Sequence, residues 1–173
     1  MTVFGFGLER ARKAYEFFDL QRTVGEATIK EFLGDMQTEE NLLREFTVKN
    51  LIVNAGKDLA ASLLGGRAGA AYLPLAYCAL GTGTTAAAAT DTALQTEVYR
   101  KSVSSISYQS TGKVIFDTTF STLEANNYTI TELGWLNASS AGTLWNHIIL
   151  SGGNTISKTN DRSLSVSYTP TFS

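Results

Sequence analysis

The sequence predicts a mainly β protein, an antiparallel β-sandwich of jelly-roll or immunoglobulin-like type, with an N-terminal helical arm. Apolar and polar residues alternate strictly through residues 163–172, which is typical of a strand with one buried face. Other short apolar runs are separated by Gly, Ser, Thr and Asn, as in sandwiches. Of the 30 charged residues, 19 lie in residues 1–70, so the composition changes along the chain.

Residues 1–49 are predicted to form a helical arm. Thr23 with Glu26 has capping-box spacing and Thr38 precedes two acids, so each is a plausible helix start. Apolar residues at helical spacing define the three faces: Leu8, Ala11, Tyr15 and Phe18; Ile29, Phe32, Leu33 and Met36; Leu42, Leu43 and Phe46. Helices this short are marginal alone. We therefore expect the arm to need another chain.

Residues 50–173 are predicted to form the β-sandwich body and to fold without the arm. The body opens with a helix at residues 55–64 that ends at Gly65–Gly66, where glycine allows the left-handed conformation. Ser110 to Gly112 is predicted as a hairpin turn. The strands are expected in residues 72–80, 96–108, 113–121, 128–137, 143–150 and 163–172.

Composition excludes several functional classes. The formal net charge is −2, without the excess of Lys and Arg typical of nucleic-acid binders. One cysteine and one histidine cannot make an internal disulfide or a His-rich metal site. No apolar run approaches the roughly 18 residues of a membrane span, and no signal peptide is recognisable. We expect no cofactor, no metal, no specific nucleic acid and no membrane partner.

Three stretches could suggest catalysis, and each has a simpler interpretation. The glycine-containing loop from Gly81 to Ala89 lacks the lysine of a phosphate loop and is interpreted as a flexible surface loop. His147 lies in an apolar strand without a nucleophile-elbow motif and is expected to be partly buried and hydrogen-bonded. Cys78 is expected to be a small core residue. The acids are scattered, so the chain is predicted not to be an enzyme.

Several phrases of the body resemble tailed-bacteriophage virion proteins of the tail-fibre-like or tail-collar-like family. They are YCALGTGTTAAAATDTALQTEVYR at residues 77–100, ITELGWLNA at 130–138 with GTLW at 142–145, LSVSYTPTFS at 164–173 and NAGKDL at 54–59. They occur in the family's order over roughly residues 50–173. Ala87 stands where the family often has proline, and residues 1–49 have no counterpart.

The resemblance implies a β-sandwich structural protein of the virion, synthesised in the bacterial host cytoplasm and without catalytic residues. It would dock on other virion proteins (tail, portal or collar, or major capsid protein) and form a homo-oligomer in the particle. It could be a tail, collar or baseplate component or a small head protein. The alternatives are a capsid decoration (cement) protein and a receptor-binding or carbohydrate-binding fibre module with Tyr128, Trp135 and Trp145 as a sugar platform.

The arm is the candidate docking element. Its aromatic and basic side chains cannot be buried by short helices alone, and burying one aromatic is worth about 1.5–3 kcal/mol. The candidate partner-binding residues are Phe4, Phe6, Arg10, Arg12, Phe17 and Phe18.

Overall fold

The computed structural model describes residues 23–172, which are mainly β with antiparallel sheets and one α-helix. The strands are β1 (Thr23–Leu33), β2 (Leu42–Lys49), β3 (Leu51–Ile52), β4 (Tyr77–Gly81), β5 (Glu97–Ser102), β6 (Ser105–Ser110), β7 (Lys113–Phe120), β8 (Tyr128–Ile130), β9 (Glu132–Leu136), β10 (Leu144–Ile149), β11 (Ile156–Lys158) and β12 (Arg162–Phe172). The helix is α2 (Asn54–Leu64), and three 3-10 turns cover Glu39–Asn41, Ala70–Tyr72 and Gly152–Asn154. No helix in this part of the chain is long and apolar enough to cross a membrane.

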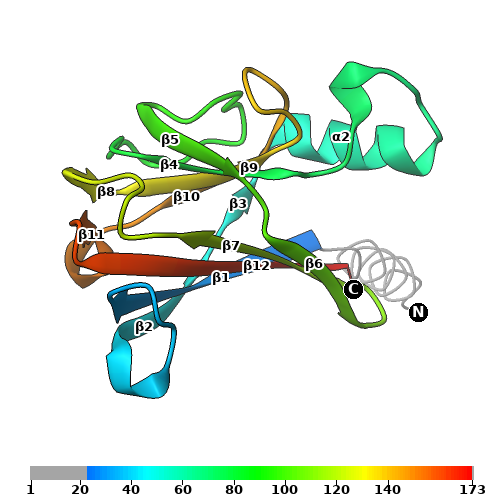
Figure 1. Ribbon diagram of the computed structural model, residues 1–173. Coiled ribbons are helices and arrows are strands. Elements are labelled where there is room, and N and C mark those ends of the chain that lie inside the picture. Colours follow the sequence, from blue (N-terminus) through cyan, green and yellow to red (C-terminus); the bar gives the residue numbers. More distant parts are fainter. Residues whose placement is uncertain (1–22, 173) are drawn as a thin grey trace, which may run out of the picture.

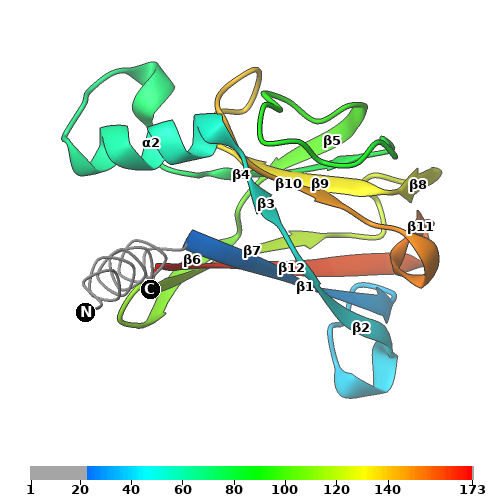
Figure 2. The same cartoon turned by 180° about the vertical axis from the view of Figure 1, so that it is seen from behind.

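The strands form two five-stranded sheets that lie face to face (Figures 1 and 2). Sheet one has the order β2-β1-β12-β7-β6, and sheet two has the order β3-β10-β9-β4-β5. Strands β11 and β8 make a separate two-stranded ribbon. The strand alternation seen in the sequence therefore supplies two apolar faces that cover each other.

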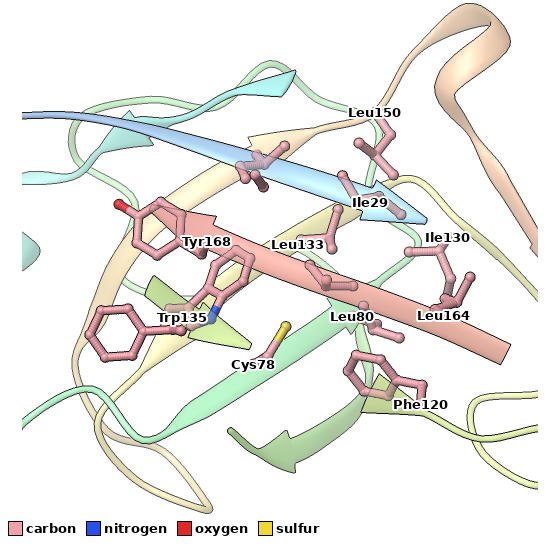
Figure 3. Close-up of a cluster of buried hydrophobic side chains, with 14 of the residues drawn as sticks. Ile29, Cys78, Leu80, Phe120, Ile130, Leu133, Trp135, Leu150, Leu164 and Tyr168 are labelled. Carbon is pink, nitrogen blue, oxygen red and sulfur yellow. The ribbon is translucent and has the colours of Figure 1, made fainter. Parts of the chain in front are cut away.

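The core lies between the two sheets (Figure 3). Tyr168 of β12 stacks on Trp135 of β9 with ring centroids 4.5 Å apart, and neither ring is exposed to solvent. Cys78 of β4 is also fully buried, as its apolar surroundings predict. Burial raises the pKa of its thiol well above the ordinary value, so it is an inert core side chain.

The predicted helices in residues 23–49 are wrong, because this segment forms β1 and β2. β1 pairs with β12 along its full length, from Thr23↔Phe172 to Leu33↔Arg162. Along β2 every second side chain is partly buried, which is the strand period of two. Met36, placed on a buried helix face by its spacing, is 69% exposed. Pairing with β12 outweighs the capping signal at Thr23, as tertiary context commonly outweighs local propensity.

The body agrees with the sequence more closely. Helix α2 forms one residue before the predicted start, and the predicted hairpin joins β6 to β7. The segment predicted as one strand over residues 96–108 is divided into β5 and β6, which belong to different sheets. The segment over 128–137 is likewise divided between β8 and β9.

Helix α2 is held against sheet two through a glycine. A Cβ atom on Gly56 would lie 2.1 Å from the carbonyl oxygen of Trp145, so only glycine permits this approach. Val53, just before the helix, donates its N–H to the same carbonyl group. This contact explains the glycine of the NAGKDL phrase and fixes the helix beside the end of β10.

Candidate functional site: an apolar groove and an open sheet edge

The six predicted partner-binding residues all belong to residues 1–22, outside the described part of the chain. The structure therefore does not place Phe4, Phe6, Arg10, Arg12, Phe17 or Phe18. Within residues 23–172, exposed large apolar side chains occur in several places, among them Leu33, Met36, Leu43 and Leu123. One group of them lines a groove between α2 and the C-terminal end of β12, elements that lie at the same end of the molecule (Figures 1 and 2).

An apolar groove of about 550 Å³ occupies this end. Its helix wall includes Leu59, Leu63 and Leu64 of α2. Its other wall includes Phe116 of β7 and Phe172 of β12. Leu64 is 92% exposed and Phe172 is 47% exposed, so the groove leaves large apolar side chains in contact with solvent.

The apolar surface beside the groove wall formed by β7 and β12 continues onto β6. Ile106 is opposite Phe116, and Tyr108 is opposite Val114, in the antiparallel pairing of β6 with β7. Directly paired residues project from the same face of a sheet, so all four lie on the inner face of sheet one. Ile106 is 46% exposed and Tyr108 is 85% exposed. Sheet two does not cover this corner of sheet one.

Strand β6 is also an open edge with little protection against pairing. It has one neighbour in the sheet, and all six of its residues are exposed. Residues 102–112 contain no charged side chain and no proline. The other edges differ: β2 and β5 each carry several charges, and β3 has two residues. Charges and short length are the usual protection of an edge strand, so β6 is the edge best suited to pair with another chain.

A buried cluster of three ionisable side chains lies elsewhere, against sheet two. The ring of His147 makes a hydrogen bond to Asp91 Oδ2 at 2.7 Å through Nδ1 and to Glu132 Oε2 at 2.9 Å through Nε2. His147 and Glu132 are fully buried. An ionised carboxylate only accepts hydrogen bonds, so a ring nitrogen that carries a proton is the donor to its carboxylate. The predicted hydrogen bonding of His147 is confirmed, whereas the ring is fully buried and not partly buried as predicted.

Glu132 makes hydrogen bonds to the backbone of residues 83–96, which belong to the longest of the phrases that resemble phage proteins, at residues 77–100. Its Oε1 accepts the N–H groups of Gly83 at 2.9 Å and Thr96 at 2.7 Å, and its Oε2 accepts that of Gln95 at 2.9 Å. Gln95 in turn exchanges two hydrogen bonds with the backbone of Thr85. Most of the loop predicted to be flexible, Gly81 to Ala89, therefore lies between two points, Gly83 and residues 95–96, that are hydrogen-bonded to one buried carboxylate.

The electrostatics of the cluster follow from these hydrogen bonds. Burial alone would raise the pKa of Glu132, but the three backbone N–H groups and His147 bring that pKa below its ordinary value. The N–H of Ala88, at 2.8 Å, lowers the pKa of Asp91, and His147 adds to the effect. Among the described residues, no group of three or more His, Cys, Asp or Glu side chains is arranged to hold a metal ion. The polar atoms of the cluster are occupied in holding the loop.

Sequence reasoning counted Glu132 and Asp91 among scattered acids and missed this cluster. One signal was available, because Glu132 is an acid inside the apolar run ITELGWL. All five residues of β9 are buried, and an acid in such a strand needs partners. The hydrogen-bond partners of Glu132 belong to residues 83–96 and to β10. Residue spacing in the sequence does not predict contacts between segments this far apart.

The aromatic platform proposed for sugar binding is wrong. Trp135 is fully buried in the core and Trp145 is 4% exposed. Trp145 donates its indole N–H to the hydroxyl of Tyr168 at 2.7 Å, so this tryptophan is part of the interior. Tyr128 is partly exposed without the two tryptophans beside it at the surface. These three side chains do not form a stacking surface.

A family model described as podophage GP4 fiber I protein gp80 matches residues 55–168, more than half of the chain. The match begins in α2 and ends in β12, so it includes the helix wall of the groove, β6 and the buried cluster. Neither the curated proteins nor the solved structures gave a match.

Proposed function

The chain belongs to the podophage GP4 fiber I protein gp80 family, and we propose on this basis that it docks on neighbouring virion proteins without catalysing a reaction. Membership makes the chain a structural component of a bacteriophage virion. The finer assignment, a β-sandwich module of jelly-roll or immunoglobulin-like type, is supported by two facing antiparallel sheets that share one core.

The open edge of β6 is the observation that carries the docking proposal. A strand edge without charge or proline is a liability in a freely soluble protein, because its backbone groups can pair with any other strand. In a virion the same edge is covered by a neighbour, which adds a strand through main-chain hydrogen bonds. The neighbour is a second copy of the chain or another tail, collar, portal or capsid protein, and residues 4–18 of the arm would add further contacts.

A catalytic role has less support. Glu132 and His147 are fully buried, and the hydrogen bonds of Glu132 are directed to the histidine and the loop backbone. We therefore propose that His147 maintains structure. Replacing it should reduce stability, and a screen for hydrolase or transferase activity should find no turnover that His147→Asn abolishes.

We propose two alternative positions for the protein in the virion, one in the tail, collar, baseplate or head and one on the capsid lattice. A tail, collar or baseplate component would occur in few copies. A capsid decoration protein would occur in many copies across the capsid lattice. Quantitative mass spectrometry of purified particles separates them, since the measured copy number must match one symmetry or the other.

The docking proposal is tested by adding charges to β6, which should prevent another strand from pairing with this edge. Ser107→Lys and Gln109→Lys together place two charges on exposed β6 positions, as natural edge strands do. We expect the double variant to fold normally and to be largely lost from particles. Leu43→Lys on the exposed face of β2 is the control and should be incorporated like the parent protein. Full incorporation of the β6 variant would show that docking uses another surface.

A further inference from the structure

Sheet two covers most of the inner face of sheet one, but it does not cover the groove at the end of the molecule. Its exposed apolar side chains are Leu63 and Leu64 of α2 and Phe172 of β12. Ile106 and Tyr108 of β6 are exposed beside it, opposite the lining residues Phe116 and Val114. A contiguous apolar surface of this kind usually marks a binding site. Its shape, a channel between a helix and a sheet, suits an amphipathic helix laid along it.

The described chain begins at this groove. Thr23, the first described residue, is paired with Phe172, which lines the groove. Thr23, to which residue 22 is bonded, therefore lies at the edge of the groove. The four residues 19–22 can span at most ~14 Å when extended, which is enough to bring residue 18 over the groove.

The sequence of this segment supplies a matching apolar face. Leu8, Ala11, Tyr15 and Phe18 recur at helical spacing, and a helix over residues 8–18 would be about 16 Å long. Such a helix is too short to be stable in water alone, so it needs a surface that buries its apolar face.

We propose that residues 8–18 bind as a helix in the groove of their own chain, with Leu8, Ala11, Tyr15 and Phe18 against the apolar walls. The tether favours the same chain over a second copy, because a short connection gives a local concentration far above that of free protein. This inference concerns contacts within one chain, and it does not depend on the proposed docking to neighbours.

Binding in this orientation sorts the predicted docking residues into two groups. With 3.6 residues per turn, Phe18 belongs to the face against the groove, whereas Arg10 and Phe17 lie on the opposite side of the helix. The groove would then present Arg10 and Phe17 outward on a fixed helix. The arm becomes an ordered part of the surface that meets the next virion protein.

Cysteine cross-linking in the full-length chain tests the proposal. The native Cys78 is fully buried and does not compete. The test variant combines Tyr15→Cys with Leu63→Cys, whose parent leucine is 39% exposed and lines the groove. The control combines Phe17→Cys with Leu63→Cys and places the first thiol on the outer face. A second pair of variants uses Phe172→Cys instead of Leu63→Cys, in case either anchor disturbs the fold.

Disulfide formation is followed by intact mass and non-reducing gel, with circular dichroism as a check on folding. We expect the Tyr15 variants to form an intrachain disulfide at a rate independent of protein concentration and about tenfold faster than the Phe17 controls. A cross-linked dimer would show that a second copy fills the groove and would overturn the assignment to the same chain. Equal rates for Tyr15 and Phe17, or no disulfide from either anchor, would show that this helix face does not occupy the groove.

Discussion

Strand β12 passes through two regions that differ in what covers them. Tyr168 and Phe172 lie on the same face of the strand, four residues apart. Tyr168 is fully buried under Trp135 of the facing sheet, whereas Phe172 is 47% exposed beside the groove. The alternating pattern continues unchanged through both. One strand therefore builds part of the hydrophobic core and part of an exposed apolar surface, and the difference arises from the extent of the opposite sheet.

A parallel contrast separates β1 and β2 from the rest of sheet one. A domain boundary between residues 49 and 50 would remove β1 and β2 from sheet one. β12 would then lose β1, the neighbour that pairs with it over its full length. Ala27 and Ile29 of β1 are also fully buried in the core. These strands therefore contribute directly to the covered region.

The largest expected effect follows from deleting them. A protein of residues 50–173 should lack a cooperative thermal transition, because β12 would lose its pairing with β1 and the core would lose Ala27 and Ile29. Residues 23–173 are the matched control and should melt cooperatively. A cooperative melt of residues 50–173 by circular dichroism would show that the body closes its core without β1.

The contrast along β12 predicts that Trp135→Ala and Phe172→Ala lower the free energy of unfolding by different amounts. Trp135→Ala removes the ring that covers Tyr168 and should lower the free energy of unfolding by about 3–5 kcal/mol. Phe172→Ala removes a half-exposed ring and should lower it by about 1 kcal/mol. Urea denaturation measures both. Equal losses would mean that the groove is as well covered as the core.

Removing the charge of the buried carboxylate should have the next largest effect. Glu132→Gln places an amide NH₂ group where backbone and histidine N–H groups point, so buried donors lose their acceptor. We expect a loss of about 2–3 kcal/mol and faster hydrogen exchange in residues 83–96. Glu97→Gln weakens a partly exposed ion pair with Arg100 and should cost less than about 1 kcal/mol. Unchanged exchange in the loop of Glu132→Gln would contradict the role assigned to the carboxylate.

The smallest effect is expected from mild acid. The pKa values of Glu132, Asp91 and Glu124 are lowered in the folded protein; burial opposes this at Glu124, and Lys101 and the Ser121 N–H outweigh it. A lowered folded pKa adds stability above the unfolded value of about 4, and this stability is lost as pH falls through the folded pKa. Urea titrations should therefore show a decline below about pH 4. The decline should be shallower in Glu132→Gln, and an identical slope would mean that Glu132 contributes little to it.

The sequence by itself determined the β character of the body, the helix at Asn54–Leu64 and the turn between β6 and β7. These depend on local chemistry: alternation along a strand, glycine at a helix end and small polar residues at a turn. It also contained the phrases that resemble phage virion proteins, a class that the family match supports.

Tertiary structure decided the rest, because the deciding contacts join distant residues. Ile29 and Phe32 fit a helix by spacing, but eleven paired positions on β12 make their segment a strand. Glu132 is an unremarkable acid in the sequence, and only the fold brings it to Gly83, Thr96 and His147. The exposure of Phe172 depends on where sheet two ends. Alternation fixes which side chains share a face, whereas burial depends on what the chain places opposite that face.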